Sequence, residues 1–420
     1  MLDRLVATGG EGVRVRRLGG DRAGEIRVTR FVRNEAVTFE EMFAFAGERT
    51  QARCRDRDVL AIQDTTVVRS DGGGGLYLHP TIALDGEDGA ILGLVYAEFL
   101  SRESGRKADR RKKDVAAKES WRWIEGARRA SLVCAEARRL TVIADRESDI
   151  FAAFALRPAH AHLVVRAAQN RALEDGERLF AHIDALPEAG RTILALPAKP
   201  GRPAREAKLA IRLANVTVKR PRNGVVADFP ETIALTFVDV CEIDPPPGET
   251  IHWRLLTTHR AQELEEALAI VDMYRRRWAI EQLFRTMKTK GFDIEAVRIA
   301  DDEPRSKLVA AVLIAAITIQ QLVHARDGRK DKPLRPITDA FEPEDLPLLE
   351  AYCAKLEGKT QRQKNPHPKR SLAYAAWVCA RLGGWTGYYG KPGPLVMLLG
   401  WRTFQAAKNG LDALHRFRNV

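Results

Sequence analysis

Strand-like and helix-like runs alternate in a fixed order over the first 166 residues of the chain. Runs rich in Val, Ile and Leu at residues 59–68, 76–83 and 91–99 predict three consecutive strands in a meander, because Gly- and Asp-rich turns separate them. A helical pattern over about residues 115–138 precedes a fourth strand, RLTVIAD, and a short helix at residues 150–156 precedes a fifth, AHLVVRA. This order predicts an α/β fold in which helices flank a mixed sheet.

The order of three strands, helix, strand, helix and strand resembles that of a ribonuclease-H-like core. The next runs, RTILALPA, AKLAIRLANVTVK, ETIALTFVDVCEI and IHWRLLTT, lie between Pro- and Gly-containing segments, so residues 167–258 predict a β-rich domain inserted into the core. A helix of nearly thirty residues is expected from about residue 262. The rest is mostly helical, with a helix stop at Gly383 and Gly384 and a last helix over about residues 395–417.

The charge balance of the chain favours an acidic partner. Of the 420 residues, 45% are hydrophobic, which is enough for a sizeable core. Lys and Arg number 68 against 56 Asp and Glu, and this difference gives a net charge of +12. Such an excess indicates a polyanion such as nucleic acid.

Apolar runs and cysteines indicate the compartment. The longest nearly unbroken apolar run, residues 308–319, is shorter than the about 20 residues that span a membrane, and the N-terminus lacks the apolar segment of a signal peptide. The five cysteines form no CxxC pair, so neither a zinc site nor a disulfide framework is indicated. We therefore expect a cytoplasmic protein with no membrane partner and with cysteines that serve packing.

Three carboxylates lie where metal-dependent chemistry would need them. Asp64 follows the first predicted strand, Asp145 follows the fourth, and Glu281 lies in the long predicted helix. The first and fourth strands are neighbours in a ribonuclease-H-like sheet, so the two aspartates would meet at one edge, and a packed helix can add the glutamate. Such carboxylates repel one another unless cations lie among them, and their oxygens suit Mg²⁺ or Mn²⁺. Taken singly, each aspartate also fits a turn or helix-cap residue.

Four residues of the long predicted helix share one face. Tyr274, Arg277, Glu281 and Lys288 are separated by three, four and seven positions, so at about 100° per residue they project within about 60° of one another. Salt bridging on a solvated face explains the three charged residues but not the tyrosine. A carboxylate ligand flanked by Arg, Tyr and Lys is what a metal site beside a phosphate backbone needs.

The chain resembles the DDE transposases of the Tn-five type, in the insertion-sequence-four group, from about residue 22 to the C-terminus. Tyr274-x2-Arg277-x3-Glu281-x6-Lys288 matches the YREK signature of that family, and IQDTT and VIADRESDIFAAF match its two aspartate blocks. The resemblance implies that Asp64, Asp145 and Glu281 form the catalytic triad. It also implies two Mg²⁺ or Mn²⁺ ions per active site, about 3.5 to 4 Å apart. Glu147 and Asp149 are interpreted as helix N-terminal residues rather than ligands.

The same resemblance implies further contacts with DNA. Trp253 matches the tryptophan of the insertion that stacks on a base flipped from the DNA end, and stacking can offset the cost of unpairing. Arg166 matches a basic residue beside the active site. Trp278 is interpreted either as core or as a second wall of the flipped-base pocket, and Arg285 is a further candidate for DNA binding. Without the resemblance, Trp253 fits a core residue and Arg166 an exposed strand-end charge.

Two basic clusters are candidates for phosphate contacts, which add affinity that depends on salt rather than on sequence. The alternative is that they are solvated faces. The first cluster consists of Arg106, Lys107, Arg110, Arg111, Lys112 and Lys113, and the second of Lys355, Lys359, Arg362, Lys364, Lys369 and Arg370. The last helices correspond to a C-terminal dimerisation region, and intramolecular packing is the competing interpretation of its apolar residues. Those residues are Leu372, Ala376, Cys379, Leu395, Leu398 and Leu399.

The resemblance implies a division of the chain into five parts. They are a partial N-terminal DNA-binding region at residues 1–50, the first part of the catalytic core at 51–166, the β-rich insertion at 167–258, the second part of the core at 259–335, and the dimerisation region at 336–420. Residues 1–33 carry eight Arg, no Lys and four acidic residues, and family members usually have a longer N-terminal helical domain. A partial end-reading region is therefore expected.

Together with these features, the resemblance implies a homodimeric enzyme of the bacterial cytoplasm that associates with the nucleoid when bound to DNA. It would be a metal-dependent endonuclease and strand transferase that binds double-stranded DNA at transposon ends and target sites in a synaptic complex. The cut-and-paste reaction would pass through a hairpin intermediate. The alternative is an N-terminally truncated protein that binds DNA and dimerises without cleaving, and that inhibits transposition.

Overall fold

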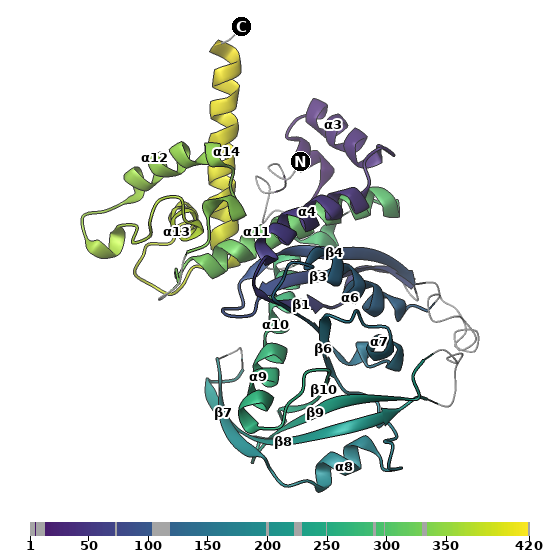
Figure 1. Ribbon diagram of the computed structural model, residues 1–420. Helices are drawn as coiled ribbons and strands as arrows, with labels where there is room; N and C mark the ends of the chain where they lie inside the picture. Colours follow the sequence, from purple (N-terminus) through teal and green to yellow (C-terminus); the bar gives the residue numbers. More distant parts are fainter. Residues whose placement is uncertain are drawn as a thin grey trace.

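The computed structural model describes residues 5, 13–71, 74–102, 118–198, 201–221, 229–248, 250–288, 291–297, 299–329 and 334–418. Its centre is one ten-stranded mixed sheet, and helices cover the part of the sheet nearest the chain termini (Figure 1). The strand order is β2-β3-β1-β5-β6-β10-β9-β8-β7, and β4 pairs with the long strand β3. The basic cluster predicted at residues 106–113 lies outside the described residues.

Five strands form the core predicted from the sequence. They are β1 (Asp58–Gln63), β3 (Gly74–Asp85), β4 (Ile91–Arg102), β5 (Arg139–Ala144) and β6 (Ala161–Arg166). Strands β1, β5 and β6 are parallel neighbours, whereas β3 is antiparallel to both β1 and β4. The resulting order β4-β3-β1-β5-β6 confirms the ribonuclease-H-like arrangement. Burial of most residues of β1 and β5 explains why both read as unbroken apolar runs in the sequence.

The first predicted strand is interrupted at Asp64. Strand β1 ends at Gln63 and β2 (Thr66–Asp71) resumes after two residues, yet both pair with the same edge of β3. Opposite the interruption lies Pro80 of β3, whose carbonyl accepts from the Asp64 backbone N–H at 3.4 Å and whose nitrogen carries no hydrogen to donate. A proline in an inner strand removes one ladder hydrogen bond, so the interruption coincides with the position where continuous pairing would fail.

The β-rich insertion continues the core sheet. It contains the helix α8 (Leu179–Ala185) and four antiparallel strands, namely β7 (Gly190–Leu196), β8 (Arg205–Lys219), β9 (Thr232–Glu242) and β10 (His252–Thr257). Strand β10 pairs antiparallel with β6 of the core, so the hydrogen-bonded sheet runs without a gap from β4 to β7 (Figure 1). Backbone pairing therefore ties the insertion directly to the core.

Helices α4 (Phe39–Cys54) and α6 (Trp121–Val133) pack on the core sheet. The helix predicted over residues 115–138 is shorter in the structure, because the chain turns at Cys134 to enter β5; residues 115–117 lie outside the described part. Gly126 allows α6 to lie close to β1, since a Cβ at this position would be 2.2 Å from Gln63 Oε1. The short helices α2 (Val15–Gly19), α3 (Arg22–Arg33) and α7 (Phe151–Ala155) complete this part.

The predicted helix of nearly thirty residues is two helices. Helix α9 (Leu264–Arg275) ends two residues before α10 (Trp278–Met287), and Arg276 and Arg277 form the break. Arg276 donates from Nη1 to the Asp85 carbonyl and from Nη2 to the Glu87 carbonyl, both at 3.2 Å. These contacts with a turn far away in the sequence fix the break, which the helical pattern of the segment itself does not indicate.

The longest helix of the core is α11 (Asp302–Ala325), which extends the predicted apolar run at residues 308–319 at both ends. By length and composition alone it is apolar enough to cross a membrane. Within the fold it is largely buried and contacts β4, α3, α4 and α10. The buried ammonium of Lys307 donates to the Asn34 carbonyl at 3.0 Å and pairs with Glu303. Its length and apolarity are thus explained by packing at the centre of the molecule.

The C-terminal region consists of α12 (Leu346–Leu356), α13 (Leu372–Leu382) and α14 (Pro394–Arg418), with a 3₁₀ turn at Gln361–Gln363 between α12 and α13. Gly384 adopts a positive φ of 93° just after α13, as the predicted helix stop requires. Most of the apolar residues assigned to dimer contacts are buried within the chain, so this prediction is wrong for them and the packing interpretation holds. The buried residues are Leu372, Ala376, Cys379 and Leu398. Leu395 is exposed, as are Leu411 and Leu414 further along α14.

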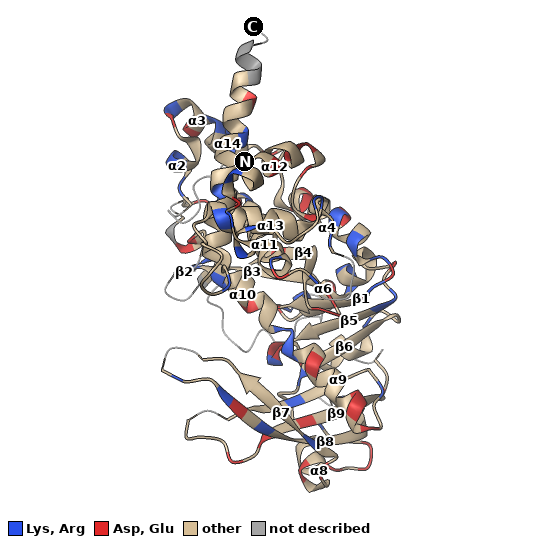
Figure 2. Cartoon of the chain, turned by 90° about the vertical axis from the view of Figure 1, so that its left-hand side faces the viewer, with Lys and Arg blue, Asp and Glu red and all other residues tan. Residues whose placement is uncertain are grey.

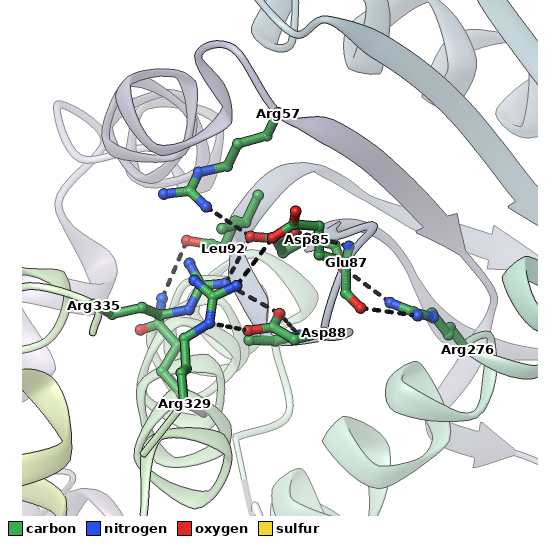
Figure 3. A network of polar contacts seen from close by, with 10 residues as sticks. Arg57, Asp85, Glu87, Asp88, Leu92, Arg276, Arg329 and Arg335 are labelled. Atoms are coloured by element: carbon green, nitrogen blue, oxygen red, sulfur yellow. Dashed lines mark hydrogen bonds and ion pairs between the residues drawn. The ribbon is translucent and has the colours of Figure 1, made fainter. Parts of the chain in front are cut away.

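A network of arginines and acids joins the C-terminal half to the core sheet at the turn between β3 and β4 (Figure 3). Buried Asp85 accepts from Arg57 at 2.7 Å and from Arg335 at 3.0 Å, and Asp88 pairs with Arg329 at 2.9 Å. Arg57 precedes β1, whereas Arg329 and Arg335 lie beyond α11. One turn of the sheet therefore collects contacts from segments that are more than two hundred residues apart.

Candidate active site

Two aspartates lie at the same edge of the sheet because they end neighbouring parallel strands. Strand β1 pairs with β5 through Ile62 and Ile143, so Asp64 and Asp145 each follow the paired region by two residues. Asp64 accepts the Thr65 backbone N–H at 2.8 Å. The Asp145 carbonyl accepts from the backbone and the hydroxyl of Ser148, at 3.0 and 2.7 Å. Local hydrogen bonds therefore fix the loops that carry both aspartates.

Arg277 links the third carboxylate to the first. Its Nη1 donates to Asp64 Oδ2 at 2.7 Å and its Nη2 donates to Glu281 Oε1 at 2.5 Å. Because Arg277 lies in the break between α9 and α10, its guanidinium reaches across to the loop after β1 while Glu281 projects from the first turn of α10. The structure therefore brings Asp64, Arg277 and Glu281 into direct contact.

The charges at this edge act on one another. Burial raises the pKa of Asp64, and the carboxylates of Asp145 and Glu281 raise it further, against the opposing effect of Arg277. Burial alone would lower the pKa of Arg277, but Asp64, Tyr274, Asp145 and Glu281 together raise it. The three carboxylates are thus close enough to interact through space, and the guanidinium compensates part of their repulsion.

Asp145 has capacity for another ligand. Its Oδ1 is buried and accepts no hydrogen bond from any part of the chain that the structure describes. Buried carboxylate oxygens are normally bonded, so this oxygen is suited to a cation. Within the described residues, three ligand atoms lie within 4.8 Å of one another at a single place, Asp175, Glu177 and His182 in the insertion. The atoms of Asp64, Asp145 and Glu281 are more widely spread, with the Arg277 guanidinium between two of them.

Tyr274 and Trp253 pack together beside the carboxylates. Tyr274 is buried at the end of α9, and its ring meets that of Trp253 on β10 edge-on, with centroids 6.0 Å apart. Burial raises the pKa of Tyr274, and nearby Asp145 raises it further. Arg166, at the end of β6, donates to the His252 carbonyl at 3.0 Å. Trp253 is half-buried and packs against the main hydrophobic core.

The face of α10 that turns to solvent carries a second aromatic group. The Trp278 residue is 51% exposed, so the core interpretation of this residue is wrong. The Arg285 guanidinium lies 5.1 Å from the centroid of the Trp278 ring. At the end of the same helix, Lys288 pairs with Glu295 at 3.2 Å. The break in the helix separates these residues from Tyr274, so the signature residues do not share the single face expected from an unbroken helix.

Two buried ion-pair residues of the site carry no signal in the sequence pattern. Asp149, expected near a helix N-terminus, accepts from the backbone N–H groups of Ala168 and Gln169 at 2.7 Å each, and it also pairs with buried Arg171. It therefore holds the loop after β6 against the loop after β5. Arg122 makes a similar connection from α6. Neither residue belongs to a periodic pattern, because its partners lie in loops and turns that are distant in the sequence.

Basic residues are exposed in two further regions. The second basic cluster, Lys355, Lys359, Arg362, Lys364, Lys369 and Arg370, is solvent-exposed throughout. Figure 2 shows Lys and Arg on α2 and α3, where Arg16, Arg17 and Arg27 are exposed. Exposure leaves both regions available to phosphate groups, and a solvated surface is the alternative.

Comparison with known protein families finds a family model that matches the chain. Residues 78–318, more than half of the 420-residue chain, match the family model described as transposase DDE domain. The matched range begins within β3 and ends within α11. It includes Asp145 and Glu281, and it starts after Asp64.

Proposed function

Because the chain belongs to the family of DDE transposases, we propose that it cuts DNA at the ends of an insertion sequence and joins these ends to target DNA. Asp64, Asp145 and Glu281 are the proposed catalytic triad. One observation carries the assignment: Asp64 and Asp145 end adjacent parallel strands, and Arg277 joins Glu281 to Asp64. The YREK spacing of the sequence supports placing the chain with the Tn-five type, in the insertion-sequence-four group.

The donor atoms at this edge fit the divalent metal that this family normally uses. The three side chains offer carboxylate oxygens, the ligands that Mg²⁺ and Mn²⁺ prefer. The buried Oδ1 of Asp145 lacks a hydrogen-bond donor among the described residues, and Arg277 shows that a positive charge is stabilised between Asp64 and Glu281. We propose two such ions per site, which when bound would activate the attacking oxygen and stabilise the leaving oxygen.

The residues around the triad would hold the DNA backbone. A guanidinium fork binds a phosphate with the same two-point geometry as a carboxylate, so Arg277 can exchange its carboxylate partners for a phosphate of the bound strand. Lys288, at the end of α10 where it pairs with exposed Glu295, and Arg166, at the end of β6, are two more cations proposed to contact phosphates. Tyr274 supports Arg277 from the buried side and can donate its hydroxyl.

Two tryptophans would contact bases at the DNA end. Trp278 with Arg285 forms an exposed platform on α10, and stacking of a base on such a ring is worth about 1 to 3 kcal/mol. Trp253, the proposed stacking residue for the flipped base, is half-buried and lies against Tyr274, and Trp278 would form the second wall of the pocket. The proposed flipped base would lie between these two rings.

The reaction is proposed to follow the cut-and-paste sequence. Water breaks one phosphodiester at each end and leaves a free 3′ hydroxyl, which attacks the opposite strand to form a hairpin. A second water opens the hairpin, and the 3′ hydroxyls then attack the target strands. A homodimer would hold both ends in a synaptic complex, with the exposed leucines of α14 as candidate contacts. We place the protein in the bacterial cytoplasm, on the nucleoid when DNA is bound.

The direct test is Glu281→Gln. This change keeps the size of the side chain but removes the charge of one proposed ligand, so Mg²⁺-dependent cleavage of a duplex carrying the inverted repeats that flank the gene should fall at least about a thousandfold. Gel-shift affinity for the same duplex should stay within about threefold, since one carboxylate adds no phosphate contact. Cleavage is measured in a single turnover with enzyme in excess.

The matched control is Glu265→Gln, an exposed glutamate in the first turn of α9 that should leave cleavage unchanged. Unchanged cleavage in Glu281→Gln would refute the triad. The alternative function, a non-cleaving inhibitor of transposition, would be supported by a different result. In that case the wild-type protein binds the duplex and inhibits an active full-length transposase but never cleaves DNA.

A further inference from the structure

Arg122 is a buried cation that touches both loops carrying the proposed catalytic aspartates. It lies in the first turn of α6 and is 5% exposed. Its Nε donates to Thr65 Oγ1 at 3.2 Å, and Thr65 directly follows Asp64. Its Nη2 donates to Glu147 Oε2 at 2.5 Å, and Glu147 lies two residues after Asp145. One side chain therefore spans the gap between the ends of β1 and β5.

The position of Arg122 itself is fixed by hydrogen bonds. Its Nη1 donates to the Glu119 carbonyl at 2.8 Å, and its guanidinium lies 5.1 Å from the centroid of the Trp123 ring. Burial and the guanidinium of Arg122 together hold the pKa of buried His79 well below its ordinary value, so His79 is neutral. The cation thus stands in a rigid setting rather than at the end of a free side chain.

A directed series of hydrogen bonds leads from Arg122 into the core. Gln63 Nε2 donates to the Trp123 carbonyl at 3.1 Å, and Gln63 Oε1 lies 3.3 Å from His79 Nε2. His79 Nδ1 lies 2.9 Å from Thr65 Oγ1. With neutral His79 protonated on Nε2, Thr65 donates to Nδ1 and its oxygen accepts from Arg122. Each group then acts consistently as donor or acceptor. These hydrogen bonds fix Gln63 and Thr65, the residues on either side of Asp64.

We propose that Arg122 is a positioning residue that sets the separation of Asp64 and Asp145, an inference that rests on the proposed function. Arg122 binds neither carboxylate directly; it holds the residue next to the first and the residue two places after the second. Two carboxylates that must share cations repel one another while the cations are absent, so their spacing needs support from outside the pair. Partners of this kind usually change metal affinity about tenfold to a hundredfold when they are removed.

Positioning and simple electrostatics predict opposite results for Arg122→Met. Removal of a positive charge near three carboxylates should strengthen cation binding by Coulomb attraction alone. Loss of positioning should weaken it, because the two loops are no longer held at one spacing. The direction of the change in metal affinity therefore separates the two effects.

The experiment titrates Mn²⁺ alone into the full chain and follows the electron paramagnetic resonance signal of free Mn²⁺. For Arg122→Met we expect the half-saturating Mn²⁺ concentration to rise about tenfold or more. Thr65→Val, which removes the acceptor of Arg122 without a change of charge or shape, should raise it in the same direction. Arg129→Met is the matched control, since exposed Arg129 lies on the same helix and pairs with half-buried Glu125 rather than with either loop; its value should equal that of wild type.

Thermal unfolding and Mg²⁺-dependent cleavage complete the test. A purely structural role predicts a lower Tm for Arg122→Met and Thr65→Val with wild-type Mn²⁺ affinity, and this result would overturn the proposal. Tighter Mn²⁺ binding in Arg122→Met would also overturn it. If Arg122→Met does not fold, Thr65→Val decides alone. Wild-type protein that binds Mn²⁺ but cleaves no DNA would refute the proposed function, while the Mn²⁺ affinities would still decide the role of Arg122.

Discussion

At the scale of single residues, Arg277 bridges two of the three carboxylates of the site. Its guanidinium contacts Asp64 and Glu281 at once, and the pKa of Arg277 is raised by the surrounding acids although burial opposes this. A planar fork with two separate donors is needed for such a bridge, because the two acceptors lie on different elements. The same fork geometry suits a phosphate, so under the proposed function Arg277 would also contact bound DNA.

Arg277→Lys keeps the charge but offers a single ammonium group, which can satisfy only one of the two carboxylates. We expect the single-turnover rate of DNA cleavage to fall about tenfold to a hundredfold, with the protein still folded. Arg275→Lys is the control, since exposed Arg275 pairs, within the described part of the chain, only with Asp272 at 3.5 Å on the same helix. Equal rates for Arg277→Lys and wild type would show that the two-point contact has no part in catalysis.

The sequence predicts some residues of the site better than others. Asp64 and Asp145 can be found because each directly follows a buried strand, and Glu281 because it stands at a fixed spacing from Arg277. The supporting residues Arg122 and Arg276 cannot be found in this way, because their partners lie on loops and turns that are distant in the sequence. A buried ion pair has no periodicity, so only the folded chain reveals it.

At the scale of elements, the approach of α6 to β1 depends on Gly126. A Cβ there would lie 2.2 Å from Gln63 Oε1 and 3.0 Å from Thr81 Oγ1, so Gly126→Ala must displace buried side chains next to Asp64. We expect a loss of about 1 to 3 kcal/mol in the free energy of unfolding, measured by urea denaturation.

Gly410 provides the matched control for this substitution. It lies in α14, and a Cβ added there would meet no neighbouring side chain or segment within 4 Å among the described residues. Gly410→Ala should therefore stabilise the helix by roughly 0.5 to 1 kcal/mol. If Gly126→Ala were as stable as wild type, the close packing of α6 on β1 would be refuted.

Local patterns predict the core strands but not how elements join. The strands β3 and β4 and the last helix follow the predicted runs to within a few residues, because alternation and turns are local properties. The break between α9 and α10 follows from contacts of Arg276 with the turn after β3, and these contacts are absent from the local pattern. The pairing of β10 with β6 is likewise a property of the whole sheet.

At the scale of the whole molecule, Asp85 joins the core to the C-terminal half. Arg57 and Arg335 both donate to its buried carboxylate. Asp85→Ala would leave the buried guanidinium of Arg335 without its main partner, and the free energy of unfolding should fall by about 3 to 5 kcal/mol. Glu87→Ala, which removes the pair of exposed Glu87 with half-buried Arg329, should cost less than about 1 kcal/mol, because Arg329 keeps its contact with Asp88. Urea denaturation measures both, and similar values would contradict the central role of Asp85.

The same network gives a pH dependence with a defined sign. Although burial alone raises the pKa of Asp85, the Glu87 backbone N–H together with Arg335 and Arg57 lowers it below the ordinary value of 3.8. A carboxyl whose pKa is lowered by folding stabilises the native state above its unfolded pKa, and this contribution is lost as the pH falls below 3.8. The Asp85→Ala variant should therefore lose less of its stability in acid than wild type does.

Pro80 has a consequence for how the strands find their alignment during folding. Only one alignment of β1 and β2 along β3 sets the donorless nitrogen against the gap at Asp64. A slip by two positions would bury a backbone carbonyl with nothing to bond it, and a slip by one would turn the apolar side chains outward. Pro80 thus favours a single register of β1 and β2 on β3, and this register determines that the chain leaves the sheet at Asp64.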